Sequence, residues 1–299
     1  MSAAGTDELV LVTGGTGNTG RRVAARLLAR GHRARAASRR PEARTDATAR
    51  SQDSQAPRFE SVRFDWDDTA THDPALDGVR RLYLVPPTAV PDPAAHLLPF
   101  LDRALRAGVD RVVLLGSSAI AETDDGLGEV YRAVRERFPQ WAVLRPSWFM
   151  QNFTGDHPHA HGLRGSGEIV TATGDGRVAF VDAEDIAEVG VRALTDERPH
   201  NTAHLITGPQ ALSYADVAAE ISRVADRQVS HRPVSRAAMR ERLAATGMPV
   251  RFAELLAGMD EAIAAGAEDR TSTTVERVTG RTPRSFAAHA AAHATVWRR

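Results

Sequence analysis

The chain has 299 residues, of which 42% are hydrophobic, and its 38 Lys and Arg residues balance its 38 Asp and Glu residues. This length suits one large domain or a domain with an appended lobe, and the balanced charge gives no general affinity for nucleic acid or an acidic membrane surface. The sequence contains no cysteine and no lysine, which excludes disulfides, thiolate chemistry and a catalytic lysine. Because no signal peptide or membrane-length apolar stretch is found, we expect a cytoplasmic protein.

The N-terminal segment predicts the order strand, glycine-rich turn, helix. An apolar run at residues 9–12 leads into Thr-Gly-Gly-Thr-Gly-Asn-Thr-Gly at residues 13–20, and an apolar stripe at helical spacing follows. Such glycines permit a tight turn, let the backbone approach a pyrophosphate and let the helix lie close to the strand, with its unpaired N–H groups facing the phosphates. The alternative is a glycine-rich turn that binds nothing. The expected dinucleotide contacts here are Gly14, Thr16, Gly17, Asn18 and Thr19.

The next predicted strand, at residues 32–37, ends in Ser38-Arg39-Arg40. In a dinucleotide fold an acid near this position binds the ribose 2′-hydroxyl of NAD. Here a hydroxyl and two guanidiniums stand instead, and these groups suit a 2′-phosphate. We therefore expect NADP(H) as cofactor. The alternative is that the arginines form a solvated turn and Glu42 accepts the ribose.

Further strands are predicted at residues 59–65, 81–85, 111–115 and 141–144, with helices at residues 94–107 and 129–138. This alternation predicts a doubly wound, parallel, Rossmann-type α/β sheet, whose ligands bind beyond the carboxyl ends of the strands. Trp66 is expected beside the adenine, and the nicotinamide half is expected near two consecutive prolines. The residues at these strand ends are therefore expected cofactor contacts: Asp65, Trp66, Val85, Pro86, Pro87, Ser117, Pro146 and Phe149.

The second half of the chain is less regular. We expect residues 1–153 to form the NADP-binding domain and residues 154–299 a smaller, mostly α-helical substrate lobe, with part of residues 178–207 returning to the sheet. Short strands are predicted at residues 168–172, 178–181 and 203–207, and helices at residues 183–194, 235–245, 249–265 and 284–297, with another starting near Ser213. A substrate cleft between lobe and sheet is the default expectation.

Several of these motifs resemble the NmrA-like group of atypical short-chain dehydrogenase/reductases. They are residues 13–20, Ser38-Arg39, Leu-Arg-Pro-Ser-Trp-Phe-Met-Gln-Asn-Phe at 144–153, Thr-Gly-Asp-Gly at 173–176, and residues 181–187 and 278–286. The chain is most similar to bacterial relatives of the ergot-alkaloid reductases of the festuclavine dehydrogenase type, over nearly its whole length. The resemblance implies NADPH-dependent reduction of quinones, enones or iminium ions. The group also includes regulators that bind the dinucleotide and reduce nothing.

A typical short-chain dehydrogenase uses a serine and a Tyr-x-x-x-Lys pair. Tyr131 and Arg135 stand at that spacing here, and Ser118 precedes the tyrosine by the interval typical of the family. Tyr131 could donate a proton, with Arg135 on the same helix face favouring its ionised form, although an arginine cannot shuttle a proton as lysine does. Tyr131 and Ser118 are therefore the candidate catalytic residues. The alternative for Tyr131 is a partly buried helix tyrosine.

An iminium acceptor needs little acid catalysis, so the protein would mainly supply orientation and an apolar wall. The candidate substrate contacts are Trp148, Met150, Asn152, Phe153 and His159, and the alternative for the apolar members is the hydrophobic core. The motif His-Pro-His-Ala-His at residues 157–161 invites a metal interpretation. We expect no metal, because Pro158 argues against a regular helix and no second ligand cluster stands out. We interpret the segment as a flexible loop over the substrate mouth, and the alternative is a plain solvated loop.

The sequence thus predicts an NADPH-dependent oxidoreductase that transfers hydride to a small apolar acceptor, such as an imine or iminium, a quinone or an enone. The expected partner is a small molecule, not nucleic acid or a membrane, and the protein is expected to form a homodimer. The alternative is a non-catalytic NADP(H)-sensing regulator that binds a protein partner. An epimerase or lyase would need a dedicated base, and the sequence shows no convincing one.

Overall fold

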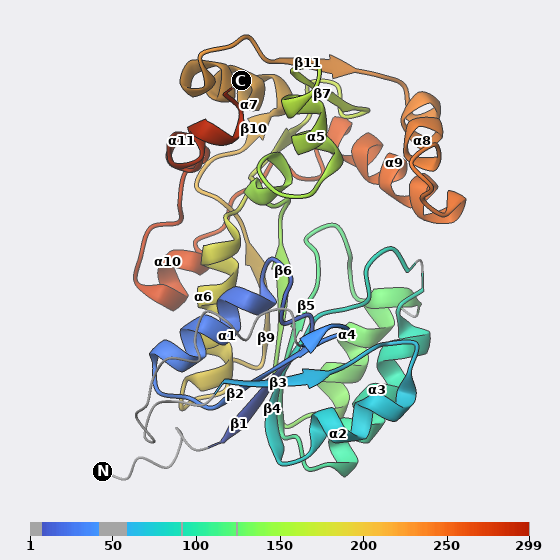
Figure 1. Cartoon of the computed structure of the whole chain (residues 1–299), viewed down its shortest axis with the longest axis vertical. Coiled ribbons are helices and arrows are strands. Elements are labelled where there is room, and N and C mark those ends of the chain that lie inside the picture. The colour runs from blue at the N-terminus through green and yellow to red at the C-terminus, as the bar shows by residue number, and fades with distance from the viewer. Residues whose placement is uncertain (1–7, 42–58, 91, 124, 299) are drawn as a thin grey trace.

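The computed structural model describes residues 8–41, 59–90, 92–123 and 125–298. Its centre is a seven-stranded parallel sheet with the strand order β3-β2-β1-β4-β5-β6-β9 (Figure 1). The order reverses beside β1, as in a doubly wound sheet, so the predicted fold class is confirmed. The strands of this sheet are β1 (Leu9–Val12), β2 (Ala34–Ser38), β3 (Phe59–Arg63), β4 (Val79–Leu84), β5 (Arg111–Leu115), β6 (Gln140–Pro146) and β9 (Thr202–Ile206).

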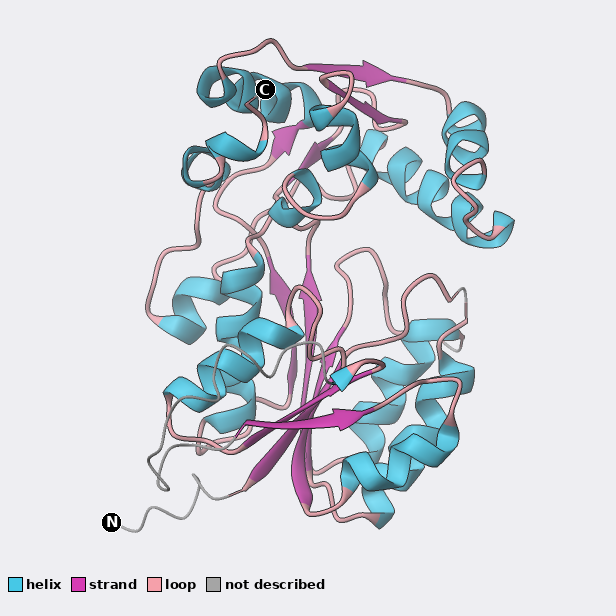
Figure 2. Cartoon of the chain, viewed as in Figure 1, coloured by secondary structure: helices cyan, strands magenta, loops and turns pink. Residues whose placement is uncertain are grey.

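Helices cover both faces of the sheet, as Figure 2 shows. On one face lie α1 (Gly20–Ala29), α6 (Ala183–Thr195) and α10 (Thr274–Thr279); on the other lie η2 (Thr69–Thr71), α2 (His72–Leu76), α3 (Ala94–Arg106) and α4 (Gly126–Arg137). Successive strand residues enter opposite cores, so Val10 packs toward α1 and α6 whereas Leu11 packs toward α3 and α4. Burial on both faces explains why the central strands are continuous apolar runs.

A second lobe lies beyond the carboxyl ends of the strands (Figure 1). It contains two small sheets, in which β7 pairs with β11 and β8 pairs with β10. Its core is aromatic, and the Trp297 indole N–H donates to the Phe153 carbonyl oxygen at 2.8 Å. The elements of the lobe are η3 (Met150–Phe153), α5 (Pro158–Arg164), β7 (Glu168–Thr171), β8 (Arg177–Val178), β10 (Leu212–Ser213), α7 (Tyr214–Ala225), β11 (Ser230–Pro233), α8 (Arg236–Ala244), α9 (Val250–Ala264), α11 (Phe286–Ala292) and η4 (Ala294–Val296).

Helix α6 and strand β9 belong to the large sheet, although they follow lobe elements such as β7 and β8 in the sequence. Helix α6 packs on α1, and β9 pairs with β6 in parallel register from Ala142 opposite Thr202 to Pro146 opposite Ile206. The residues that form the sheet and its helices therefore do not end at residue 153. None of the described helices is both long and apolar enough to cross a membrane.

The prediction of a flexible loop at residues 157–161 is wrong. Pro158 is the first residue of α5, and the His157 ring nitrogen Nδ1 accepts from the His159 backbone N–H at 3.2 Å as the helix cap. Proline suits this position, because the first N–H groups of a helix have no intrahelical partner. The short helices α2 and α10 and the strand β11 were not predicted. Glu42 and the polar segment that follows it lie outside the described residues.

Candidate functional site

The glycine loop between β1 and α1 has the geometry of a phosphate cradle. Gly14 has a φ of +60°, which favours glycine. A Cβ on Gly20 would lie 2.2 Å from the Gly14 carbonyl oxygen, so the start of α1 can approach the strand end only without a side chain there. Thr16, Gly17 and Asn18 are exposed at the mouth of the loop. The loop therefore leaves backbone N–H groups and the positive end of α1 accessible to an anion.

The other predicted cofactor residues lie at the same edge of the sheet. Because all seven strands are parallel, their carboxyl ends meet there. Three hydrogen bonds join neighbouring strand ends: Val85 N–H to Thr13 Oγ1 (2.7 Å), Phe64 N–H to the Ser38 oxygen (2.9 Å) and Ser118 N–H to the Pro146 oxygen (2.9 Å).

The part of this edge that follows β2 and β3 carries charged and aromatic side chains. Arg39 and Arg40 are exposed directly after β2. After the neighbouring strand β3, Trp66 is half-buried, with its ring centroid 4.8 Å from that of Phe64, and the Asp65 carbonyl oxygen faces His72 Nε2 at 3.0 Å.

Toward the middle of the sheet the edge becomes apolar. Val85, Leu115 and Phe149 are half-buried and pack on one core, and Pro86 and Pro87 are half-buried beside them.

Tyr131 is placed in the core instead of the cleft. Its side chain is 3% exposed, and its hydroxyl oxygen accepts from the Ser117 backbone N–H at 2.8 Å. Burial raises the pKa of Tyr131 to about 12. Arg135 points away and pairs with Glu122 at 2.8 Å, so the expectation that Arg135 favours an ionised tyrosine is wrong. The surroundings of Tyr131 are those of a buried helix tyrosine that holds the end of β5.

Ser118 is also buried, and its partner was not found from the sequence. Its hydroxyl donates to Glu268 Oε2 at 2.7 Å, and both side chains are almost wholly buried. Arg270 donates to Glu268 at 3.3 Å and to the Ser118 carbonyl oxygen at 3.0 Å, and Arg145 donates to the same oxygen at 3.1 Å. Residues from far along the chain therefore fix the loop after β5. Because Ser118 and Glu268 are 150 positions apart in the sequence, no local pattern could have indicated this contact.

The predicted substrate contacts divide into two groups. Met150 and Phe153 are 1% and 0% exposed and form part of the lobe core, as the alternative interpretation had it. Trp148 and Asn152 are half-buried. The ring of His159 stacks on that of Phe153 with centroids 5.6 Å apart, and this histidine lines a cavity.

That cavity lies between α5 and α8 and has a volume of about 980 Å³. Met239 and Leu243 contribute apolar surface to it. His157 and His159 lie on its wall, and burial lowers the pKa of His157 to about 4 and that of His159 well below its usual range, so both are neutral near pH 7. The charged side chains of the lining are Asp156, Glu168, Glu241 and Arg242. The three carboxylates already have partners, since Asp156 contacts His161 at 2.9 Å, Glu168 pairs with Arg232 at 3.2 Å and Glu241 with Arg240 at 3.8 Å.

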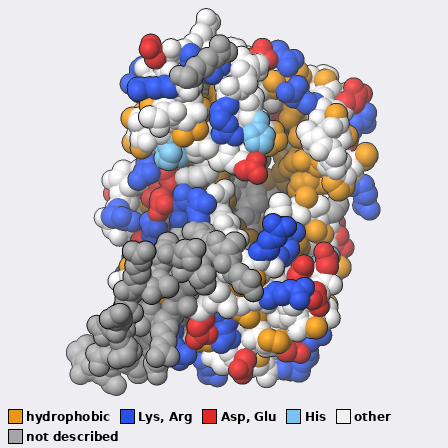
Figure 3. Space-filling view, viewed as in Figure 1, with side chains coloured by type: hydrophobic (Ala, Val, Ile, Leu, Met, Phe, Trp, Pro, Cys, Tyr) orange, Lys and Arg blue, Asp and Glu red, His pale blue; other side chains and the backbone are white. Residues whose placement is uncertain are grey.

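A second cavity, of about 690 Å³, lies between α9 and the loop after β5. Its lining is mostly apolar, with Ile120 on one side and Leu255 and Met259 on the other. Leu255 is 43% exposed, which is high for a large apolar side chain. Figure 3 shows a hollow between the two lobes, with hydrophobic side chains along the side where α8 and α9 lie. Because this cavity starts directly after Ser118, it adjoins the edge of the sheet.

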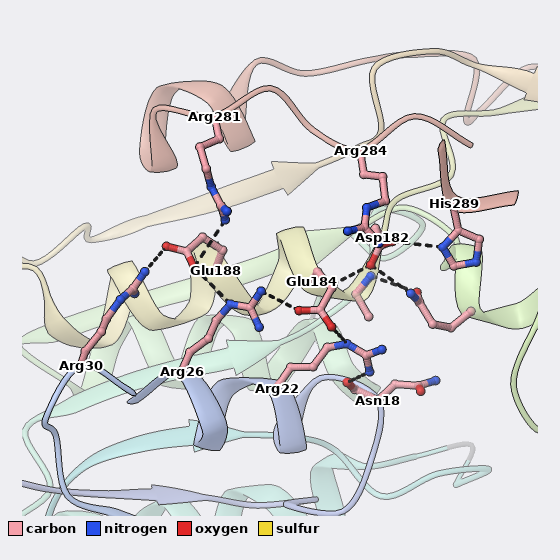
Figure 4. A network of polar contacts seen from close by, with 12 residues as sticks. Asn18, Arg22, Arg26, Arg30, Asp182, Glu184, Glu188, Arg281, Arg284 and His289 are labelled. Carbon is pink, nitrogen blue, oxygen red and sulfur yellow. Dashed lines mark hydrogen bonds and ion pairs between the residues drawn. The ribbon is translucent and has the colours of Figure 1, made fainter. Parts of the chain in front are cut away.

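The N-terminus of α6 joins the two lobes through a buried carboxylate (Figure 4). Asp182 is fully buried and accepts from the Glu184 N–H at 2.8 Å and from Gln151 Nε2 at 3.0 Å. Arg284 and His289 reach the same carboxylate at 3.1 Å from the C-terminal segment. Burial alone would raise the pKa of Asp182, but the hydrogen bonds from His289, Glu184 and Gln151 lower it below its usual range. Among the described residues, no group of three or more His, Asp or Glu side chains is arranged to hold a metal ion.

Comparison with known proteins agrees with this geometry. A profile of the NmrA-like family matches residues 6–286. The chain is 46% identical over 288 residues to the uncharacterized oxidoreductase YesF of Bacillus subtilis (96% of each chain), and 33% identical to agroclavine dehydrogenase of Claviceps fusiformis (96% of this chain, 98% of the relative). The NADPH complex of the quinone oxidoreductase QOR2 from Escherichia coli superposes with a TM-score of 0.76 at 22% identity, covering 95% of this chain and 99% of that one. The resemblance inferred from the motifs is thereby confirmed. The chain therefore belongs to the NmrA-like family, as one of its oxidoreductases.

Proposed function

We propose that this protein is an NADPH-dependent reductase that transfers hydride to an apolar acceptor bound between the two lobes. The observation that carries the proposal is the apolar cavity directly beyond Ser118, at the same sheet edge as the glycine loop and Arg39-Arg40. The names of the relatives support it, since they include agroclavine dehydrogenase and an NAD(P)H azoreductase of Xenophilus azovorans that is 33% identical.

In this proposal each group of the sheet edge has its own task. The glycine loop binds the pyrophosphate, and Arg39 and Arg40 bind the 2′-phosphate, which selects NADPH over NADH. The half-buried surface of Val85, Leu115 and Phe149 supports the nicotinamide ring and excludes water from it. When bound, the reduced cofactor supplies the hydride, and the protein supplies orientation and a dry wall.

The burial of Tyr131 narrows the choice of acceptor. A simple ketone needs a proton donor at its oxygen during reduction, and the phenol that would occupy that role in a typical short-chain dehydrogenase is in the core. An iminium ion accepts hydride without such a donor. We therefore propose a bulky iminium or related cationic acceptor, ahead of quinones and enones.

The burial of Tyr131 also favours the sensing regulator as the second candidate. A protein that binds the dinucleotide and reduces nothing needs no exposed proton donor either. Oxidation of NADPH, followed at 340 nm with a panel of cyclic iminium ions, quinones, enones and sulfonated azo dyes, separates the two. Faster turnover with the iminium ions than with the other members of the panel is the expected result. Tight NADPH binding without turnover across the panel would favour the regulator, and turnover of the anionic dyes alone would contradict the proposed acceptor class.

A further inference from the structure

Helices α1 and α6 face each other through a row of ion pairs (Figure 4). Arg22, Arg26 and Arg30 recur every four residues and therefore share one face of α1. Arg22 Nε binds Glu184 at 2.5 Å, Arg26 binds both Glu184 and Glu188, and Arg30 binds Glu188. The two glutamates are also four residues apart, on the face of α6 that meets α1.

Of these three arginines, Arg22 also contacts the glycine loop. Its Nη1 donates to the Asn18 carbonyl oxygen at 2.7 Å while its Nε stays on Glu184. The side chain of Arg22 is 15% exposed and that of Glu184 33%, so their ion pair is partly buried, whereas the contact with Asn18 lies at the surface. Burial alone would raise the pKa of Glu184, but the hydrogen bonds from Arg26 and Arg22 lower it, so the carboxylate is ionised near pH 7.

This arrangement acts on the part of the loop that would meet the cofactor. Thr16, Gly17 and Asn18 are exposed, and the Gly17 N–H is held by the Gly14 carbonyl oxygen at 2.8 Å. When the Asn18 carbonyl is held, the peptide unit joining it to Thr19 is held as well, because that unit is planar. We propose that Glu184 is a positioning residue for the dinucleotide: it holds Arg22, which fixes the Asn18–Thr19 peptide where the pyrophosphate binds. The inference rests on the proposed function, since it assumes that NADPH occupies the loop.

Charge alone predicts the opposite effect of removing Glu184. A carboxylate near an anion site repels the anion, so its loss would strengthen binding if the side chain acted only through its field. A positioning role predicts weaker binding, because the loop must then be ordered by the ligand itself. The sign of the change in affinity therefore distinguishes the two explanations.

The test compares Glu184→Ala with the matched control Glu188→Ala, using calorimetry to measure the Kd of each protein for NADPH and NADH. Both variants remove a carboxylate that faces the arginines of α1, and both should lower the thermal unfolding temperature. We expect Glu184→Ala to raise the Kd about tenfold for both dinucleotides, which share the pyrophosphate. Glu188→Ala should stay within about twofold of wild type. Adenosine 2′-monophosphate has no 5′-phosphate to contact the glycine loop, so its Kd should be the same in wild type and Glu184→Ala.

A second variant, Arg22→Lys, carries the test if Glu184→Ala does not fold. Lysine keeps the charge but lacks the fork that reaches Glu184 and Asn18 together, so the same weakening is expected. Tighter binding by Glu184→Ala, an equal loss in both glutamate variants, or wild-type affinity in Arg22→Lys would overturn the inference while leaving the proposed function intact. Failure of the wild-type protein to bind NADPH would overturn both.

Discussion

Removal of the buried Asp182 carboxylate should destabilise the fold far more than removal of an ordinary helix cap. In Asp182→Ala, α6 loses its N-cap, which is worth about 1 kcal/mol. Gln151 Nε2 and His289 Nδ1 are then left buried without this acceptor, at about 1–3 kcal/mol each. The total is about 3–7 kcal/mol, which at about 2 °C per kcal/mol for a chain of this size lowers Tm by roughly 6–14 °C.

The matched control is Ser213→Ala at the N-terminus of α7. Ser213 also caps a helix, accepting from the Asp216 N–H at 3.1 Å, but it is not fully buried and leaves no buried donor behind. Its loss should cost about 1 kcal/mol and roughly 2 °C. Thermal unfolding at pH 7, monitored by circular dichroism, measures both variants. Equal Tm shifts would refute the argument that burial of the partners sets the cost.

Acidification provides an independent check on Asp182. Its pKa is lowered in the fold, so the stability it contributes is full above its ordinary value of 3.8 and is lost as the pH falls through the lower folded value. The difference in Tm between wild type and Asp182→Ala should therefore be constant from pH 5 to 7 and shrink only at strongly acidic pH. A difference that shrinks between pH 7 and 5 would contradict the assigned direction.

Three further predictions concern the cofactor site, the buried tyrosine and the lobe. Replacing Arg39 and Arg40 together by Ala should raise the Kd for NADPH about 10–100-fold and that for NADH less than about threefold, and equal losses in calorimetry would contradict the 2′-phosphate assignment. Tyr131→Phe should keep kcat/KM within about threefold while Tm falls by roughly 2 °C for one lost hydrogen bond, whereas a hundredfold loss of rate would restore a catalytic role. Burial raises the pKa of Asp260 to about 6 from an ordinary value of 3.8, so its burial costs stability as the pH rises from 4 to 6, by up to about 3 kcal/mol. Asp260→Asn should therefore gain stability relative to wild type over that range, and a constant difference in Tm would exclude the raised pKa.

The large sheet could be predicted from the sequence because the residue patterns that specify its strands and helices are local. A strand buried on both faces must be apolar throughout, and a close approach of helix to strand requires Gly20, so both leave readable patterns. Proline at residue 158 was misread, because the same residue that breaks a helix interior also suits its first turn.

The tertiary contacts of the site leave no such pattern. A spacing of four placed Tyr131 and Arg135 on one helix face, but the long arginine side chain extends to solvent while the phenol turns into the core. The contact of Ser118 with Glu268, and that of Asp182 with His289, depend on how the second lobe folds back over the strand ends. The sequence neighbours of these residues do not specify that placement.

The position of β9 at the edge of the large sheet restricts how this protein can be divided. A fragment that ends at residue 153 would expose the whole hydrogen-bonding edge of β6, because Thr202–Ile206 would be missing. It would also leave the apolar face of α1 uncovered, because α6 would be missing. Such an open edge beside an uncovered apolar surface invites self-association. During synthesis the nascent chain passes through the same incomplete state until β9 has left the ribosome. Fragments meant to isolate the cofactor site should therefore retain α6 and β9 and shorten the outer lobe instead.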